Sequence, residues 1–358
     1  MTVERVAPRP SSDPTPATVT VVIPCFDYAD YLPGAVRSAL NQVGVEVDVI
    51  VVDDASTDGS LAVARGFADD DTRVQVLAHD HNSGPVETFN DGLAQAKGEF
   101  LVRLDADDRL TPGSLERAVA VARAYPTVGL IYGHPLHVVD ESFPEARSVP
   151  TGWTVWPGLV WLADRCRNGL NVITSPEVVM RRSVVDVVGG QKPLAHTHDM
   201  EMWLRIAAFS DVAYIHGVDQ AWHRDHPRSL SAREVDPLRD LRERVDAFDT
   251  LFSGVASSVP DAAALHIMAR TAVASDSIAR AEGLFDTRVV NRELLTEYLE
   301  LSASLVDHPT ALRHWKTVQR RAARPTGSAI RPAYLFDRLA RRLRSERSWR
   351  RWHRSGVF

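Results

Sequence analysis

The sequence predicts an α/β fold, with a mainly parallel sheet covered by helices on both faces and a helical region toward the C-terminus. Short apolar runs alternate with helix-like segments through the first half of the chain, which is the pattern of βαβ units. The runs are almost continuous in Val, Ile and Leu, as expected for strands buried on both faces. From residue 234 to about 322, apolar residues recur at a spacing near 3.6 with few Pro or Gly, which predicts helices.

In chain order, the predicted strands cover residues 19–24, 47–54, 74–79, 100–105 and 128–133. Helices are predicted between them, at residues 30–42, 60–68, 84–97 and 112–124. Residues 134–232 read as irregular, apart from a helix in "HDMEMWLRIAAF". The expected organisation is a flexible segment 1–17, an α/β domain 18–232, a helical region 233–325 and a basic amphipathic tail 326–358.

The composition is that of an ordinary soluble protein, because 44% of the 358 residues are hydrophobic, 25% are charged and the mean hydropathy is -0.16. The longest apolar runs are too short to cross a bilayer. The Pro- and Ser-rich first residues have no apolar stretch, so no secretory signal is expected. The cysteines are Cys25 and Cys166, which excludes a disulfide framework and favours a cytoplasmic location.

The C-terminal tail is strongly basic, with 14 Arg or Lys from residue 312 onward against Asp337 and Glu346. Leu335, Leu339 and Leu343 form one stripe among these Arg residues. This pattern predicts weak, peripheral attachment to the inner face of an anionic membrane. A helix packed on the acidic body is the alternative, and no nucleic acid partner is expected.

Acidic residues recur where the predicted strands end, within residues 24–27, 53–56 and 105–108. In open α/β sheets, ligands bind outside the carboxyl ends of the strands. Three carboxylates in four positions, Asp105, Asp107 and Asp108, repel one another unless a cation neutralises them. GxGxxG, P-loop and GxSxG motifs are absent, so the pattern favours a Mg²⁺ or Mn²⁺ site shared with substrate phosphates.

Four segments occur in an order that resembles family 2 glycosyltransferases of the GT-A fold. They are "VTVVIPCFDYADYLPGAVRSALNQ", "VDVIVVDDASTDGS", "NSGPVETFNDGLAQAKGEFLVRLDADD" and "HDMEMWLRIA". The resemblance covers roughly residues 18–231. It implies an inverting, metal-dependent hexosyltransferase that uses a nucleoside diphosphate sugar. A UDP-sugar is the leading donor, dTDP- and GDP-sugars stay open, and the acceptor is a glycan, a lipid-linked sugar, a peptide or a metabolite.

Matched by position, the resemblance also implies roles for individual residues. The residues implied to bind the nucleotide sugar are Pro24, Phe26, Asp27, Asp54, Asn82, Gly84, Asp105 and Ala106. In the "DAD" segment, which resembles the DxD motif of the family, Asp107 would ligate the metal. "WHRDHPRSLS" resembles a segment in which a His completes this site, which indicates His226 before His223. Asp199 would be the catalytic base, with a pKa depressed by a helix N-terminus.

Other readings of these residues stay open. His196 and His198 beside Asp199 allow a metallohydrolase site. Trp153, Trp156 and Trp161 are placed either to meet a sugar or to pack, whereas Trp203 and Glu201 are expected to be structural. Two other functions also remain: a non-catalytic sugar-nucleotide-binding protein on the same fold, and a metal-dependent nucleotidyltransferase or hydrolase.

Overall fold

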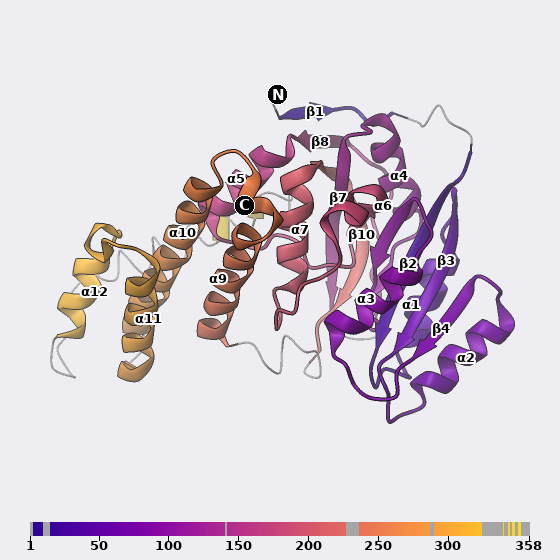
Figure 1. The fold of residues 1–358 in the computed structure, drawn as a ribbon, viewed down its shortest axis with the longest axis horizontal. Helices are drawn as coiled ribbons and strands as arrows, with labels where there is room; N and C mark the ends of the chain where they lie inside the picture. Colours follow the sequence, from indigo (N-terminus) through magenta and orange to yellow (C-terminus); the bar gives the residue numbers. More distant parts are fainter. Residues whose placement is uncertain are drawn as a thin grey trace. The chain divides into compact units, whose positions relative to one another are not determined.

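The computed structural model describes residues 3–9, 15–139, 142–226, 236–286 and 290–323, together with six positions between 339 and 351 (Figure 1). The chain divides into two compact units. One comprises Met1–Leu162 and Ile173–Arg233, and the other comprises Ala163–Val172 and Glu234–Phe358. Most of the predicted basic tail, and the membrane attachment proposed for it, lies outside the described residues.

The first unit is built around one ten-stranded sheet. Its strands are β1 (Glu4–Val6), β2 (Ala17–Cys25), β3 (Val45–Asp53), β4 (Val74–Ala78), β5 (Phe100–Arg103), β6 (Arg109–Leu110), β7 (Val128–Val138), β8 (Gly152–Trp156), β9 (Val179–Arg181) and β10 (Asp211–Arg224). Its helices are α1 (Leu32–Leu40), α2 (Ser60–Asp70), α3 (Pro85–Gln95), α4 (Ser114–Ala124), α6 (Arg182–Val188) and α7 (His198–Phe209), while α5 (Gly158–Asn168) runs on into the second unit.

The strands lie in the order β1-β8-β10-β7-β9-β5-β2-β3-β4, and β6 pairs with β10 off this path. The pairs β5·β2, β2·β3, β3·β4 and β7·β10 are parallel. Strand β9 is antiparallel to both β5 and β7 and joins the two parallel parts of the sheet. The mainly parallel sheet predicted from the sequence is therefore confirmed.

Helices cover both faces of the sheet, which explains why the central strands are apolar at nearly every position. On one face, Val19, Val21 and Ile23 of β2 share a buried core with residues of α1, α2 and α4. The residues that alternate with these along β2 point to the opposite face of the sheet, and Gly92 of α3 packs against that face. A Cβ atom on Gly92 would lie 2.4 Å from Cγ1 of Val22 and 2.9 Å from Cγ2 of Val52. Only a residue without a side chain lets α3 approach β2 and β3 this closely.

Two sequence expectations were wrong in this unit. The described residues between 134 and 226 are not irregular, because they extend β7 and supply β8, β9 and the 14-residue β10. Residues 140–141 and 227–232 of this prediction lie outside the described residues. Residues 4–6, expected in a flexible segment, form β1 and pair with β8 in the register Val6↔Trp153. A three-residue edge strand is held by backbone hydrogen bonds and leaves no periodic pattern in the sequence.

The second unit is helical, as expected from the 3.6-residue spacing. Its further helices are α9 (Pro237–Ser253), α10 (Ala262–Gly283), α11 (Arg292–Leu305) and α12 (Trp315–Ala322), with short 3-10 turns at Val255–Ser258, Leu284–Asp286 and Pro309–Ala311. Asp236 caps α9 by accepting hydrogen bonds from the backbone N–H groups of Leu238 and Arg239. Within the parts of the chain that are described, no helix has the length and apolar content needed to cross a bilayer.

Candidate functional site

The carboxyl ends of β2, β3 and β5 meet at one edge of the sheet because these strands are parallel neighbours. Pro24, Phe26 and Asp27 lie at the end of β2, Asp54 follows β3, and Asp105 to Asp108 follow β5. The end of β10 brings His223 and His226 to the same residues, through contacts with Asp108 and Asp107. The acidic segments that are distant in sequence are thus brought together.

Asp54 organises the loop that precedes α3. Its carboxylate accepts hydrogen bonds from the backbone N–H of Ser83 at 2.7 Å and of Gly84 at 2.9 Å. Nδ1 of His79 lies 2.8 Å from the same carboxylate, which is almost fully buried. Gly84 adopts a φ of +85° that favours glycine. Asp54 therefore fixes the position of Gly84, while the neighbouring Asn82 is exposed.

Asp27 plays a similar part at the end of β2. Its backbone is left-handed, with a φ of +57°, and its carboxylate accepts hydrogen bonds from the backbone N–H groups of Thr57 and Asp58. The neighbouring Phe26 exposes 42% of its surface. An exposed aromatic ring beside a fixed turn is suited to stacking against a planar ligand.

Arg103, at the end of β5, supports Asp105. Its guanidinium lies 2.9 Å from Oδ1 of Asp105 and sits over the ring of Phe89 at 5.8 Å. The Arg103 side chain is buried, whereas that of Asp105 is 35% exposed. Arg103 is therefore a buried cation that supports a carboxylate partly exposed at the surface. Ala106, next to it, is buried.

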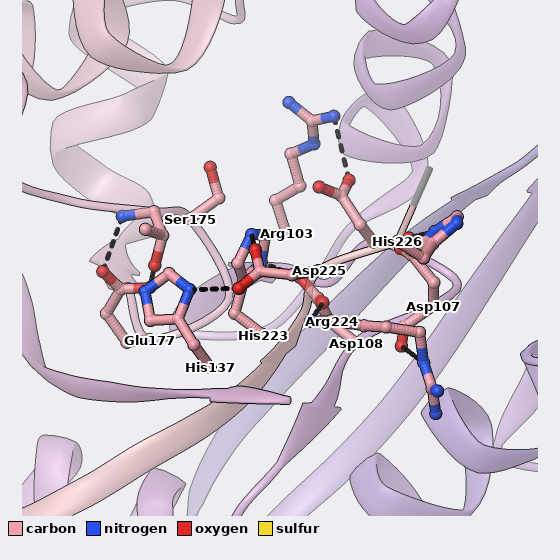
Figure 2. Close-up of polar contacts among 12 residues, drawn as sticks. Arg103, Asp107, Asp108, His137, Ser175, Glu177, His223, Arg224, Asp225 and His226 are labelled. Carbon is pink, nitrogen blue, oxygen red and sulfur yellow. Dashed lines mark hydrogen bonds and ion pairs between the residues drawn. The ribbon is translucent and has the colours of Figure 1, made fainter. Parts of the chain in front are cut away.

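Asp107 and His226 form a close pair at the same edge (Figure 2). Oδ2 of Asp107 lies 2.8 Å from Nε2 of His226, and both side chains are largely buried. The rings of Tyr28 and Tyr31 flank the imidazole, with their centroids 6.0 and 5.6 Å from the centroid of the imidazole ring. Nδ1 of His226 is buried and has no hydrogen-bond partner within the described residues. A carboxylate oxygen and an imidazole nitrogen that converge in this way fit a divalent cation such as Mn²⁺.

Asp108 fixes the end of β10. Its carboxylate accepts a hydrogen bond from the backbone N–H of Arg224 at 2.8 Å and lies 3.1 Å from Nδ1 of His223. Burial raises the pKa of Asp108, and His223 opposes this effect. Burial lowers the pKa of His223, but Asp108 and then Glu177 and Asp225 outweigh it and raise the value to about 10. His223 thus contacts Asp108, and it is His226 that faces Asp107.

Asp199 stands in the first turn of α7, as expected, but its environment differs from the one predicted. Its carboxylate accepts hydrogen bonds from Oγ of Ser175 at 2.9 Å and from the backbone N–H of Met200 at 2.6 Å. The pKa of Asp199 is raised, because burial outweighs the opposing effects of Arg103, Ser175 and Met200. The prediction of a depressed pKa was wrong, since desolvation exceeds the stabilisation from a helix terminus. A raised pKa suits a group that takes up a proton near neutral pH.

The structure also decides between several readings of nearby residues. Trp153, Trp156 and Trp161 are buried, so they pack in the protein and do not present a surface to a sugar. Trp203 is buried, and Glu201 forms a fully buried ion pair with Arg205 at 2.8 Å, as their structural reading predicted. In the described part of the chain, neither His196 nor His198 belongs to a group of three residues that could ligate a metal.

Sequence reasoning missed several residues at this edge, namely His79, Arg103, Ser175, Glu177, His137 and Asp225. His79 comes at the end of the predicted strand 74–79, beside the buried Asp54, which is a signal that could have been used. His137 and Asp225 lie 88 positions apart, and only the pairing of β7 with β10 brings them together.

Comparison with known proteins gives a family match over part of the chain. Residues 20–189 match the family model described as "Glycosyl transferase family 2". The chain is 40% identical over 115 residues to the succinoglycan biosynthesis protein ExoO of Rhizobium meliloti, a segment that covers 32% of each chain. It is 30% identical over 139 residues to the chondroitin synthase of Pasteurella multocida, covering 39% of this chain and 14% of that protein. The chain thus matches only about a third of the length of ExoO.

Solved structures share the fold across most of the chain. S. aureus TarS 1–349 in complex with UDP-GlcNAc superposes with a TM-score of 0.60 at 17% identity, covering 85% of this chain and 89% of that one. The mannosyltransferase PcManGT of Pyrobaculum calidifontis, in complex with GDP-Man and Mn²⁺, gives a TM-score of 0.55 at 18% identity and covers 97% and 87%. The matched segment, residues 20–189, thus belongs to glycosyltransferase family 2. The solved structures show the fold, an α/β unit of the GT-A type followed by a helical C-terminal region.

Proposed function

We propose that this protein is an inverting, metal-dependent glycosyltransferase that moves a sugar from a nucleoside diphosphate sugar, most simply a UDP-sugar, to an acceptor hydroxyl. The observation that carries the proposal is the pair of Asp107 and His226, two metal-ligand types that converge at the carboxyl edge of a GT-A sheet. TarS has been solved with UDP-GlcNAc and PcManGT with GDP-Man and Mn²⁺, which supports a sugar-nucleotide donor and a divalent cation.

In this proposal, the nucleotide lies along the ends of β2 and β3. Phe26 stacks on the base, and Asp27 and Asp54 hold the two loops that line the pocket, which contain Pro24, Asn82 and Gly84. Asp105, supported by Arg103, accepts hydrogen bonds from the ribose, next to the small side chain of Ala106. Both carboxylates that shape these loops already accept hydrogen bonds from backbone N–H groups, so the two loops need no rearrangement of these contacts to receive the donor.

The cation is proposed to sit between Asp107 and His226. When bound, it would stabilise the negative charge that develops on the departing diphosphate. An imidazole in the ligand set favours Mn²⁺ over Mg²⁺, which prefers oxygen ligands throughout. The chain contributes the orientation, because His226 follows the end of β10 and Asp108 anchors that end through the backbone of Arg224.

Asp199 is proposed to accept the proton of the acceptor hydroxyl as its oxygen attacks the anomeric carbon from the face opposite the diphosphate. Ser175 donates to Oδ2 of Asp199 and Met200 donates to Oδ1, so the carboxylate is held in one orientation. Burial makes it a stronger base than an exposed carboxylate. The acceptor class and a cytoplasmic or peripheral membrane location remain proposals from the sequence.

Product analysis separates this function from its rivals. The full chain would be incubated with UDP-, dTDP- and GDP-sugars and Mn²⁺ in the presence of candidate acceptors, and the nucleotide products would be resolved by chromatography. Release of a nucleoside diphosphate together with a β-linked product from an α-linked donor is expected. Release of nucleoside monophosphate or pyrophosphate would establish a hydrolase or nucleotidyltransferase instead. Donor binding without turnover for any acceptor would indicate a binding protein.

A further inference from the structure

A second cluster of metal-ligand side chains lies at the ends of β7 and β10, separate from Asp107 and His226 (Figure 2). His137 and His223 are paired positions in the parallel register of these strands. Their rings lie edge to face, with the ring centroids 5.3 Å apart. Asp225 follows His223 by two residues, and its backbone N–H donates to the carbonyl of Val138, which continues the ladder. Because side chains alternate along a strand, this spacing puts His223 and Asp225 on the same face as His137.

The atoms of the cluster have the spacing of a metal site. One ligand atom from each of the three side chains lies within 4.8 Å of the others. Oδ2 of Asp225 is 3.0 Å from Nδ1 of His137, and Oδ1 is 3.8 Å from Nε2 of His223. Tetrahedral ligands about 2.1 Å from a zinc ion stand about 3.4 Å apart, a value between these two distances. Small side-chain rotations therefore bring all three atoms to one ion.

The environment of His223 also matches that of a metal ligand. Its Nδ1 is held at 3.1 Å by the buried carboxylate of Asp108, so Nε2 is the nitrogen directed toward Asp225. A histidine that ligates a metal commonly donates its other ring N–H to a carboxylate, which sets the ring orientation and the tautomer. Asp108 holds His223 in this way from the side away from the cluster.

We propose that His137, His223 and Asp225 form a second cation site, which binds Zn²⁺ or a similar divalent first-row transition metal. Two imidazoles and one carboxylate favour such ions over Mg²⁺ and leave a coordination position for water. The ion would link the ends of β7 and β10 directly beside His226. This proposal does not depend on transferase activity, because it concerns ion binding alone.

The alternative is that the cluster is only an ion pair. In that case Asp225 would accept hydrogen bonds from the two histidines, and no metal would bind with useful affinity. The side chain of Asp225 is 50% exposed and that of His137 is 32% exposed, values that fit both a metal site and an ion pair. Direct measurement of metal binding decides between them.

Cobalt is a suitable probe, because Co²⁺ bound by imidazole and carboxylate gives a visible absorption band. The full chain would be freed of metal with EDTA, dialysed and titrated with Co²⁺, for the wild type and for His137→Gln and Asp225→Asn. His81→Gln is the matched control at an exposed histidine, and Asp107→Asn removes the other site. We expect two Co²⁺ ions in the wild type, one at each site. The ion that remains in Asp107→Asn is expected to be the one whose affinity falls by about 10- to 100-fold or more in the two cluster variants, at least the loss caused by removing an outer-shell partner. The band should persist in His81→Gln and Asp107→Asn.

An unchanged band in both His137→Gln and Asp225→Asn would overturn the proposal, as would a band that disappears in Asp107→Asn alone. A second measurement needs no variant. Zn²⁺ should protect His137 and His223 of the wild-type protein from diethylpyrocarbonate, as mapped by mass spectrometry, while His81 continues to react. Equal modification of all three histidines with and without Zn²⁺ would also refute the site.

Discussion

Nε2 of His226 lies 2.8 Å from Oδ2 of Asp107, although 119 positions separate the two residues in the chain. Both side chains are largely buried, and the rings of Tyr28 and Tyr31 lie against the imidazole. A carboxylate and an imidazole held together in this way are ready to share one cation, and this arrangement leads to the first prediction.

Removal of divalent metal should abolish sugar transfer. After treatment with EDTA and dialysis, activity should return with Mn²⁺ and, less efficiently, with Mg²⁺. Asp107→Asn should lower kcat by roughly 10² or more, because charge stabilisation by a metal is worth several kcal/mol. His226→Gln should mainly raise the Mn²⁺ concentration needed for half-maximal rate. Rates would be measured with saturating donor, and full activity in EDTA would rule out the metal.

Asp199→Asn should collapse transfer while donor binding persists, since asparagine keeps the size of the side chain but cannot accept the proton. The expected loss is on the order of 10² to 10⁴ in kcat. In the wild type, the rate should fall as the pH drops through the pKa of Asp199, because the base must be ionised. Burial raises that pKa, so this acid limb should lie above the ordinary carboxyl value of 3.8.

The measurement is the pH profile of kcat at saturating donor, beside calorimetric titration of the donor. Ser175→Ala is the graded variant, because it leaves Asp199 in place and removes one hydrogen bond to the carboxylate. It should shift the acid limb to higher pH with a smaller loss of rate. Wild-type turnover in Asp199→Asn would mean that another group is the base.

Glu201→Gln should destabilise the protein and is therefore unsuitable as a neutral control for Asp199. Glu201 and Arg205 are each 1% exposed, and removing one charge leaves the other buried without its partner. Breaking such a pair costs about 3–5 kcal/mol. Asp186→Asn breaks the exposed Arg182–Asp186 pair and should cost less than about 1 kcal/mol. Urea unfolding followed by tryptophan fluorescence compares the two, and equal midpoints would contradict the prediction.

Gly92→Ala should destabilise the protein although alanine favours helices. Its Cβ would meet Val22 at 2.4 Å, so either α3 or the sheet must shift, at a cost of about 1–3 kcal/mol. Gly66 in α2 is the matched control, because a Cβ there meets nothing within 4 Å. Gly66→Ala should stabilise the protein by about 0.5–1 kcal/mol. Opposite shifts in melting temperature are expected, and shifts of the same sign would refute the packing argument.

The sequence predicts the first half of the fold well because β2, β3 and β5 are made of Val, Ile and Leu that are buried on both faces. The prediction fails for β10, because polar residues interrupt the apolar pattern of this strand. Asp219 in β10 is buried, yet it is paired with His134 and Arg147. These partners lie 85 and 72 positions away, so a buried carboxylate cannot be distinguished from a loop residue by local pattern alone.

The candidate site divides in the same way. Asp54 and Asp105 to Asp108 stand out because carboxylates at strand ends have a local signature. His226 was identified only through the family resemblance, and the environment of Asp199 depends on burial by residues from several elements. The His137, His223 and Asp225 cluster was not predicted, because it results from the register of two strands.

The late position of β10 in the chain has a consequence for biosynthesis. A nascent polypeptide that has emerged only through β9 already contains β2, β3, β5 and the aspartates at their ends, but it lacks the strand that lies between β7 and β8. It also lacks His226, so a cation would find only half of its ligands. In the proposed function, sugar transfer would therefore begin only after residue 226 has emerged from the ribosome, and a product truncated within β10 would lack one of the two proposed metal ligands.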